Sequence, residues 1–214
     1  RQLRSAALVL TISVASWISG FFLQGIEWTR PAGPPVRVAL VQANIPQLMK
    51  WDREQYLATL NLYHDLSAPL WAQTQIVIWP EAAITNFYDN ARDFLDAEAA
   101  QAQRHGSSPI TGIPTLQRAS TAADQSYMRN SAVALADGNT TFYHKRHLVP
   151  FGEYVPLEKQ LRGLIRFFDL PMSDFVAGSM QQPTLDAGGV SFGTSICYEV
   201  VYPEIARATP ASTA

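Results

Sequence analysis

One stretch of the sequence constrains the fold more than any other. Ser5–Ile26 reads SAALVLTISVASWISGFFLQGI and contains no charged residue. As an α-helix it would be roughly 33 Å long, which matches the hydrocarbon core of a bilayer. Arg1 and Arg4 precede it, and Trp17 and Trp28 are candidate interfacial anchors. The positive charge before the stretch predicts a membrane-spanning helix over residues 1–26 with its N-terminal end in the cytoplasm.

Two other interpretations of this stretch stay open. A signal peptide also has an apolar core, but this stretch is long for one and no A-x-A cleavage site follows it. A buried helix of a soluble core would be equally apolar. The serine, threonine and glycine residues within the stretch are typical of a helix that packs closely on other helices in a membrane. We therefore expect the membrane-spanning role.

Composition narrows the class of protein further. Charged residues make up 16% of the 214-residue chain, below the ~25% of an ordinary soluble domain. The single cysteine excludes an internal disulfide framework and a multi-cysteine zinc site. With a net charge of −2 and scattered lysine and arginine residues, the sequence carries no basic patch for nucleic acid. An enzyme, a binding module and a membrane-tethered domain remain.

The rest of the chain reads as a linker followed by one α/β domain. The linker, residues 27–35, includes three prolines that stiffen the backbone and cannot continue a helix. In residues 36–214, stretches of helical and strand periodicity alternate, and Asp137-Gly138 marks a tight hairpin. This order predicts a layered α/β domain with a mixed sheet. We expect strands over residues 36–42, 75–79, 109–113, 130–136, 140–144 and 190–198, and helices over residues 53–72, 90–104 and 157–168.

Three predicted strands end near a residue that can take part in acyl chemistry. Glu81 follows QIVIWP, Lys145 follows TFYH and Cys197 follows SFGTSI. A carboxylate can take the proton of a thiol, the thiolate can attack a carbonyl or nitrile carbon, and an ammonium can stabilise the resulting oxyanion. Taken alone, each residue also has an ordinary structural interpretation: an acid in the first turn of a helix, a solvated strand end and a small buried side chain. Only a fold that unites the three would separate these interpretations.

The segments around these residues resemble the nitrilase, or carbon–nitrogen hydrolase, superfamily. Its glutamate, lysine and cysteine segments are similar to WPEAAI (79–84), HKRHLVPFGEYVP (144–156) and TSICYE (194–199). The order and spacing of the segments are similar as well. The resemblance implies an α/β fold of the α-β-β-α sandwich type. It also implies a general base, an oxyanion stabiliser and a nucleophile, here Glu81, Lys145 and Cys197.

A narrower resemblance is to the branch of this superfamily that N-acylates bacterial lipoproteins. It rests on NIPQLMKWD (44–52), HLVPFGEYVP (147–156) and CYE (197–199), and on the apolar stretch before the domain. This resemblance implies that four more residues support catalysis: Trp51, Glu153, Tyr198 and Glu199. Glu153 would lie beside the triad and support the lysine or a leaving group. The resemblance also places the protein in the inner membrane, with the domain on the periplasmic side.

The reaction implied by the resemblance is an acyl transfer in two steps. Cys197 would take an acyl chain from the sn-1 position of a membrane phospholipid as a thioester, and the N-terminal amine of a diacylglyceryl-cysteine apolipoprotein would accept it. No metal or organic cofactor is called for. The thioester needs a site near the bilayer with little access for water. A membrane-anchored amidase that releases ammonia, or an inactive tethered binding module, remains an alternative because the triad alone does not separate them.

An apolar segment between the lysine and cysteine motifs is a candidate lipid contact. Residues 165–177 read IRFFDLPMSDFVA, and their two aspartates argue against a simple buried strand. The segment is either a core helix followed by a loop or a mobile arm that touches lipid or an acyl chain. The arm would use five side chains: Phe167, Phe168, Leu170, Met172 and Phe175.

Two further patterns are weaker candidates. Gly189–Gly193 fits G-x-S-x-G around Ser191, but a nucleophile elbow needs a strand before it and a helix after it, and a strand-like run follows here. His144 and His147 are three residues apart, but in a strand and a turn their side chains would diverge. We therefore expect neither a serine nucleophile nor a metal site.

The two ends of the sequence indicate a fragment. The chain begins with Arg1 and stops in ATPASTA, whereas the domains it resembles continue well past the cysteine segment. We therefore expect a catalytic domain that is truncated at its C-terminal end. Such a fragment can be inactive by itself even where its parent protein is an enzyme.

Overall fold

The chain forms two compact units, residues 1–35 and residues 36–213. The computed structural model describes residues 2–27, 30–31, 33–47, 49–118, 126–136, 138–154, 156 and 175–208.

The first unit contains one long helix, α1, which spans Gln2–Leu23. Its window Arg4–Leu23 is long and apolar enough to cross a membrane by length and composition. Large apolar side chains on this helix are exposed, with Trp17 83% and Phe21 73% accessible. The predicted helix is therefore confirmed, and its passage through a bilayer stays a prediction. The second predicted interfacial anchor, Trp28, lies outside the described residues.

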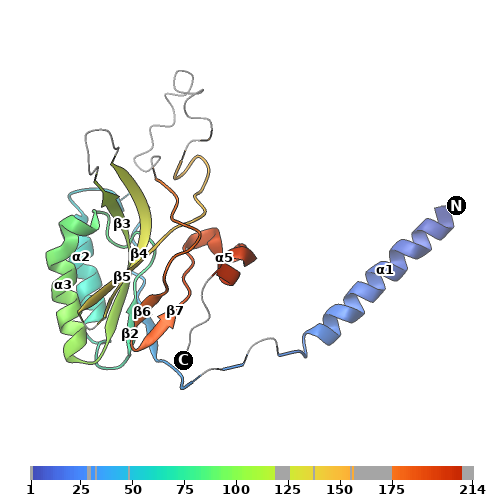
Figure 1. The fold of residues 1–214 in the computed structure, drawn as a ribbon, viewed down its shortest axis with the longest axis horizontal. Helices are drawn as coiled ribbons and strands as arrows, with labels where there is room; N and C mark the ends of the chain where they lie inside the picture. The colour runs from blue at the N-terminus through green and yellow to red at the C-terminus, as the bar shows by residue number, and fades with distance from the viewer. Residues whose placement is uncertain are drawn as a thin grey trace. The chain divides into compact units, whose positions relative to one another are not determined.

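The second unit is built on a five-stranded mixed sheet in the order β1-β2-β3-β4-β5 (Figure 1). The first three strands are parallel, and β4 and β5 join them in antiparallel pairs. The strands span Val38–Leu40 (β1), Ile76–Ile78 (β2), Ser108–Gln117 (β3), Tyr127–Ala136 (β4) and Asn139–His144 (β5). The mixed sheet predicted from the alternation of elements is confirmed.

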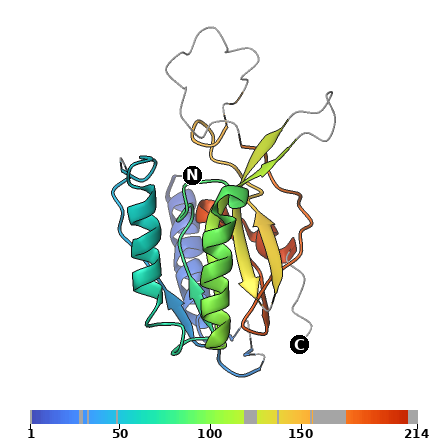
Figure 2. The ribbon, with the colours of Figure 1, turned by 90° about the vertical axis from the view of Figure 1, so that its left-hand side faces the viewer.

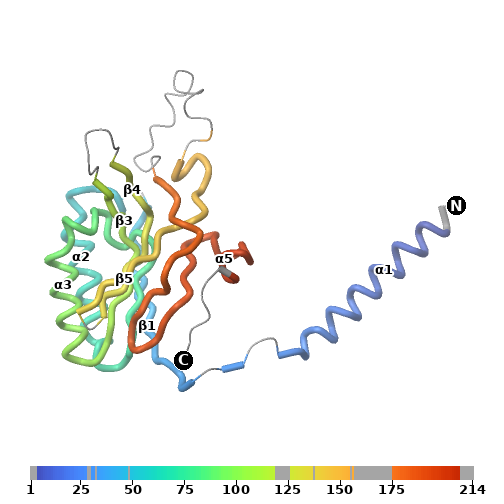
Figure 3. Tube along the Cα trace, in the orientation of Figure 1, coloured from blue at the N-terminus to red at the C-terminus, as the bar shows by residue number. Residues whose placement is uncertain are grey.

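Two layers cover the faces of this sheet. Helices α2 (Tyr56–Ser67) and α3 (Tyr88–Arg104) lie side by side on one face (Figure 2). A hairpin of β6 (Leu185–Ala187) and β7 (Val190–Phe192) lies on the other (Figure 3). Because successive strand residues point to opposite faces, the sheet supplies two cores. Val77 and Val133 pack with the helices, and their neighbours Ile76 and Ala132 pack with the hairpin side.

The two hairpins differ in how well the sequence reveals them. The hairpin predicted around Gly138 is confirmed, because Ala136 pairs with Asn139, and Asp137 itself lies outside the described residues. The β6–β7 hairpin, whose two strands are each only three residues long, was not predicted from the sequence. Its turn residues Gly188 and Gly189 have φ of 58° and 75°, which is the backbone that two-residue hairpin turns require and that glycine adopts readily.

The strand predicted over residues 190–198 is wrong in its second half. The strand ends at Phe192, and Cys197–Val201 form a 3₁₀-helix, η2, followed by α5 (Pro203–Ala208). Gly193 follows the strand, and the buried carboxylate of Glu199 accepts a hydrogen bond from the backbone N–H of Ile196. The helix predicted over residues 157–168 lies outside the described residues.

Candidate active site

Glu81 is placed by the loop that follows β2. Pro80 has no N–H to continue the strand, and the loop crosses β3 very closely at Gly112. A Cβ atom on Gly112 would lie 2.6 Å from the Pro80 oxygen, the Glu81 Cα and the Ala82 nitrogen. Ala82 itself has φ of 46°, a left-handed backbone that alanine rarely adopts. The loop is thus held in a strained path that directs Glu81 toward the carboxyl ends of the strands, and such strain is common at functional sites.

Lys145 directly follows β5, and its side chain is only 1% exposed. Its Nζ lies 3.1 Å from Glu81 Oε1 and 3.0 Å from Glu153 Oε2. Burial by itself would lower the pKa of Lys145, but the hydrogen bond to Glu153 and the charges of both carboxylates raise it above its ordinary value. Lys145 is therefore an ammonium at neutral pH, and its protons face oxygens of both carboxylates.

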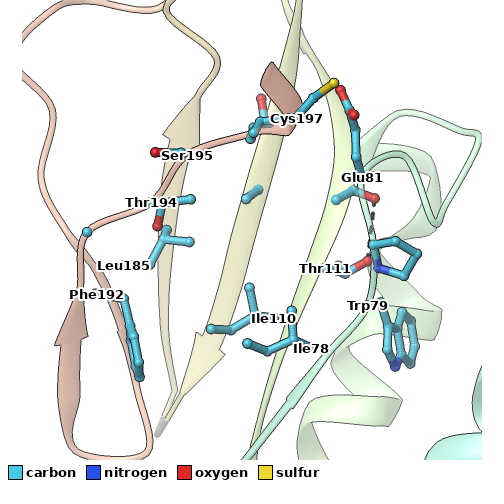
Figure 4. Close-up of a pocket in the computed structure, with 16 residues that line it drawn as sticks. Ile78, Trp79, Glu81, Ile110, Thr111, Leu185, Phe192, Thr194, Ser195 and Cys197 are labelled. Carbon is cyan, nitrogen blue, oxygen red and sulfur yellow. Dashed lines mark hydrogen bonds between the residues drawn. The ribbon is translucent and has the colours of Figure 1, made fainter. Parts of the chain in front are cut away.

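Cys197 lies at the first position of η2 and is exposed. Its φ of 57° is again left-handed, as at a sharp turn that presents a side chain away from the backbone. Figure 4 shows its thiol pointing toward the carboxylate of Glu81. The arrangement therefore brings a thiol, a carboxylate and an ammonium group to one place.

Glu199 connects the cysteine turn to the lysine segment. Its carboxylate is fully buried and accepts four hydrogen bonds. Oε2 accepts from the Ile196 N–H at 2.8 Å and from the Tyr143 hydroxyl at 2.9 Å. Oε1 accepts from the backbone N–H groups of Arg146 at 2.6 Å and His147 at 3.0 Å. Burial and the charge of Glu199 raise the pKa of Tyr143, so this hydroxyl keeps its proton and stays a donor.

A cavity of about 340 Å³ opens beside the thiol. Apolar side chains of β2, β3 and the β6–β7 hairpin line most of it, including Ile78, Ile110 and Phe192 (Figure 4). Glu81 and Cys197 also line it. An apolar space with a few convergent polar groups is the usual form of a small-molecule site.

Comparison with known proteins assigns the domain. Residues 37–214 match the model of the carbon–nitrogen hydrolase family. The chain belongs to the carbon–nitrogen hydrolase family. This confirms the resemblance found in the sequence and the α/β, nitrilase-like fold.

Curated relatives of this carbon–nitrogen hydrolase chain carry a narrower name. It is 44% identical over 98% of its length to "Apolipoprotein N-acyltransferase" of Pseudomonas aeruginosa (strain UCBPP-PA14), of which it covers 40%. Proteins of the same name in Azotobacter vinelandii (strain DJ / ATCC BAA-1303) and Coxiella burnetii (strain RSA 493 / Nine Mile phase I) are 45% and 36% identical over 92% and 95% of the chain. The chain covers 38% and 40% of these two relatives. It thus spans about two fifths of the length of these relatives.

Solved structures agree at the level of the fold. An amidase from Nesterenkonia sp. superimposes with a TM-score of 0.51 at 22% identity, over 81% of this chain and 60% of the amidase. A CN-hydrolase superfamily protein from Xanthomonas campestris, solved with an arsenic adduct in the active site, gives a TM-score of 0.52 at 20% identity, over 78% and 55% of the two chains. At these identities the likeness concerns the fold of the carbon–nitrogen hydrolase domain.

The predicted supporting residues lie at different distances from the cluster of charged side chains around Lys145. Glu153 is part of it, and Glu199 holds the turn beside it. The Tyr198 ring centroid lies 5.7 Å from Lys145 Nζ, and its hydroxyl donates to the Leu148 oxygen at 2.8 Å. Trp51 is half-buried in the turns before α2 and is not among the residues that line the cavity.

Two residues of the cluster were missed by sequence reasoning. Asn130, in β4, places its Nδ2 2.6 Å from an oxygen of both Glu81 and Glu153. Lys50 donates from Nζ to the backbone oxygen of Glu81 at 3.0 Å. Burial lowers the pKa of Lys50, and the charge of Glu81 opposes that shift. Lys50 directly precedes Trp51 inside a segment that the sequence had singled out, whereas Asn130 had no signal beyond its place in a strand.

The weaker candidates lie elsewhere. Ser191 is exposed in β7 and donates to Asp186 Oδ1 at 2.6 Å, and strand β7 ends one residue later. His144 bonds Ser131 through Nδ1 at 2.7 Å, whereas the ring of His147 stacks on Tyr202 with centroids 4.2 Å apart. Within the described ranges, no group of three or more histidine, cysteine, aspartate or glutamate side chains could hold a metal ion.

Most of the predicted lipid arm cannot be compared with the structure. Phe167, Phe168, Leu170 and Met172 lie outside the described residues. Phe175 is described and is only 4% exposed, and its backbone N–H donates to the Glu153 oxygen at 3.0 Å. Its side chain packs inside the domain, which argues against the lipid contact predicted for this residue.

Proposed function

We propose that the protein is an N-acyltransferase that uses Glu81, Lys145 and Cys197 as a catalytic triad. It would carry an acyl chain from a membrane phospholipid, through a thioester on Cys197, to the N-terminal amine of a diacylglyceryl-cysteine apolipoprotein. One observation carries the proposal: the buried Lys145 contacts Glu81 while the Cys197 thiol points at the same carboxylate. The name shared by curated relatives at 36% to 45% identity supports the choice of acyl transfer.

In the first half-reaction, Glu81 takes the proton from the Cys197 thiol. The two hydrogen bonds that described side chains donate to the Glu81 carboxylate both fall on Oε1, which leaves Oε2 for the thiol proton. The sulfur then bonds to the sn-1 ester carbonyl carbon, whose oxygen becomes an oxyanion beside the Lys145 ammonium. When the carbon–oxygen ester bond breaks, the lysophospholipid leaves with the proton held by Glu81, and an acyl thioester remains.

In the second half-reaction, the amine of the lipoprotein attacks the thioester carbonyl carbon. Glu81 takes a proton from the attacking nitrogen, and Lys145 again faces the oxyanion. The carbon–sulfur bond breaks, the amide leaves, and the proton returns to Cys197. Water could resolve the same thioester, so the reaction needs a site that excludes it. The apolar lining beside Cys197 supports such exclusion.

We further propose that α1 anchors the catalytic unit at the inner membrane, with residues 36–214 on the periplasmic side. The apolar helix and the arginine at its start support this orientation. In intact cells, a thiol reagent that cannot cross the inner membrane should label Cys197, and the Cys197→Ala variant should lack that label. Labelling only after the inner membrane is opened would contradict the orientation.

The proposed function is tested with the protein at its natural length in bacterial membranes. With phospholipid labelled in the sn-1 chain, the wild type should form a hydroxylamine-sensitive acyl-protein and release lysophospholipid, and Cys197→Ala should do neither. Ser191→Ala, the matched control at the rejected serine motif, should retain both. Normal lipoprotein acylation by Cys197→Ala would refute the thioester and favour a binding role. Release of ammonia from amides without lysophospholipid would identify an amidase.

The lipid arm stays part of the proposal for its undescribed residues. Polar replacement of Phe168 or Met172 should impair turnover of phospholipid but spare a small soluble ester, because only the lipid needs the apolar contact. Equal loss on both substrates would contradict this role.

A further inference from the structure

Asn130 occupies a central place among the charged groups of the site. Its single Nδ2 atom lies 2.6 Å from Glu81 Oε1 and 2.6 Å from Glu153 Oε1. Lys145 Nζ lies 3.1 Å from the same two oxygens. An amide nitrogen carries two hydrogens and can serve two acceptors, whereas an amide oxygen there would face two carboxylate oxygens with no hydrogen between them. Asn130 therefore acts as a double donor.

The backbone of Asn130 adds a second connection. Its carbonyl oxygen accepts the backbone N–H of Lys145 at 2.8 Å. One buried residue of β4 thus holds the lysine through its main chain and both carboxylates through its side chain. Glu153 is fixed from its other side by the Val149 N–H, which donates to Oε2 at 2.8 Å. The bridge between Glu81 and Glu153 is consequently supported by a further hydrogen bond on the Glu153 side.

We propose that Asn130 is a positioning residue that holds the carboxylates of Glu81 and Glu153 in place and leaves Glu81 Oε2 free to act on the thiol. The inference rests on the proposed role of Glu81 as general base. Two neighbouring carboxylates normally favour sharing a proton. Donors on both oppose that tendency, because hydrogen bonds to the charged form stabilise it. A neutral amide does this without cancelling the negative charge that proton abstraction requires.

Other described side chains also face the carboxylates of Glu81 and Glu153. Lys145 lies between the carboxylates, and Lys50 approaches Glu81 through its backbone oxygen. Tyr198 lies over Lys145, and Cys197 points at Glu81. Both lysines remain present when Asn130 is changed. A change in proton affinity in an Asn130 variant therefore reports the loss of the amide donors.

The test replaces Asn130 by Asp, which keeps the shape and exchanges the donors for a third carboxylate. In full-length protein in membranes, the acidic limb of thioester formation against pH should move upward by about one unit. The rate below that limb should fall about tenfold, with the plateau at higher pH within about threefold of the wild type. Asn139→Asp adds the same charge at the exposed start of β5 and should leave the limb in place.

Other outcomes decide against the inference. A lower plateau with an unmoved limb would show that Asn130 serves only the fold. If Asn130→Asp does not fold, as judged by its thermal midpoint, Asn130→Ser supplies the test: it donates one hydrogen bond in place of two and should move the limb upward by less. An unmoved limb in a folded Asn130→Ser variant overturns the proposal.

The pH dependence of Cys197 alkylation by iodoacetamide separates this inference from the proposed function, since it needs no lipid. If the wild type forms no thioester with phospholipid but Asn130→Asp still moves the acidic limb of alkylation, the acyl-transfer proposal fails and the role of Asn130 stands. If the limb stays in place in both measurements, the role of Asn130 fails whatever the substrate.

Discussion

The carboxylate–lysine cluster and the cysteine turn are built in contrasting ways. The cluster, formed by Glu81, Lys145, Glu153 and Asn130, is largely buried, and its members hydrogen-bond one another directly. The cysteine turn is exposed and left-handed at Cys197, and the carboxylate of Glu199 connects it to the lysine segment. The charged groups are thus held by hydrogen bonds to each other, while the turn that carries Cys197 is held by the buried carboxylate of Glu199.

The difference follows from what each part has to do. Groups that stabilise charge act most strongly where they are preorganised and shielded from water. A nucleophile must reach a substrate, so its own side chain cannot be packed. Its turn therefore depends on a neighbouring anchor. This contrast predicts that changes in the cluster affect stability and chemistry together, whereas changes at the anchor act mainly through the position of the thiol.

The largest effect is expected at Lys145. Lys145→Met leaves two neighbouring carboxylates without their buried cation, so the free energy of unfolding should fall by about 3–5 kcal/mol. Acyl-enzyme formation should fall by about 10³-fold because the oxyanion loses its ammonium. Denaturant unfolding and single-turnover acylation measure both effects.

Lys50→Met is the matched control for that experiment. Lys50 meets Glu81 only at its backbone oxygen, so its removal leaves the two carboxylates paired with Lys145. Its losses should be clearly smaller on both measurements. Equal losses in the two variants would show that the direct contact between Lys145 and the carboxylates contributes no more than the contact of Lys50. The proposed difference between the cluster and the cysteine turn would then be wrong.

Glu199→Gln should have the next largest effect. The amide keeps one acceptor oxygen but turns a nitrogen toward two of the four donors, and leaving a buried donor unpaired costs about 1–3 kcal/mol. The turn should shift, and acylation should fall by about 10²-fold, because small displacements of a nucleophile are costly. Glu204→Gln, an exposed change in α5, is the control. Wild-type acylation by Glu199→Gln would show that Glu199 does not position the thiol.

Gly112→Ala probes the cluster through its geometry alone. The new methyl group would meet backbone atoms of residues 80–82 at 2.6 Å, and backbone cannot move aside as a flexible side chain can. Glu81 should shift, and kcat should fall by about tenfold with little change in KM. Gly20→Ala adds the same methyl group where, among the described residues and apart from its own helix backbone, no atom lies within 4 Å, and should change neither. An unaltered kcat in Gly112→Ala would mean that the position of Glu81 tolerates movement.

The sequence predicted one of these regions better than the other. Strand periodicity followed by Pro80 and Glu81, and the motif after β5, located the acid and the lysine because local pattern and fold agree there. Asn130 could not be found this way: an asparagine inside a strand has no local signature, and its role exists only once β4 lies beside the Glu81 loop. The residues before Cys197 look like a strand by composition, but the contacts of Glu199 override that propensity.

The smallest expected effect concerns His144, whose backbone adjoins Lys145 while its ring bonds Ser131. Burial, and to a lesser extent the charge of Arg129, lower its pKa to about 4. The unfolded chain, with a histidine pKa near 6.5, binds the proton more readily. Stability contributed by the neutral ring is therefore complete above about pH 6.5 and is lost as pH falls toward about 4. Allowing for partial exposure, the loss should be on the order of 1–2 kcal/mol.

Urea unfolding of the wild type and of His144→Asn across this pH range measures the loss, and the Asn variant should show a flatter dependence of stability on pH. If both proteins lose stability in parallel, the acid sensitivity does not come from His144.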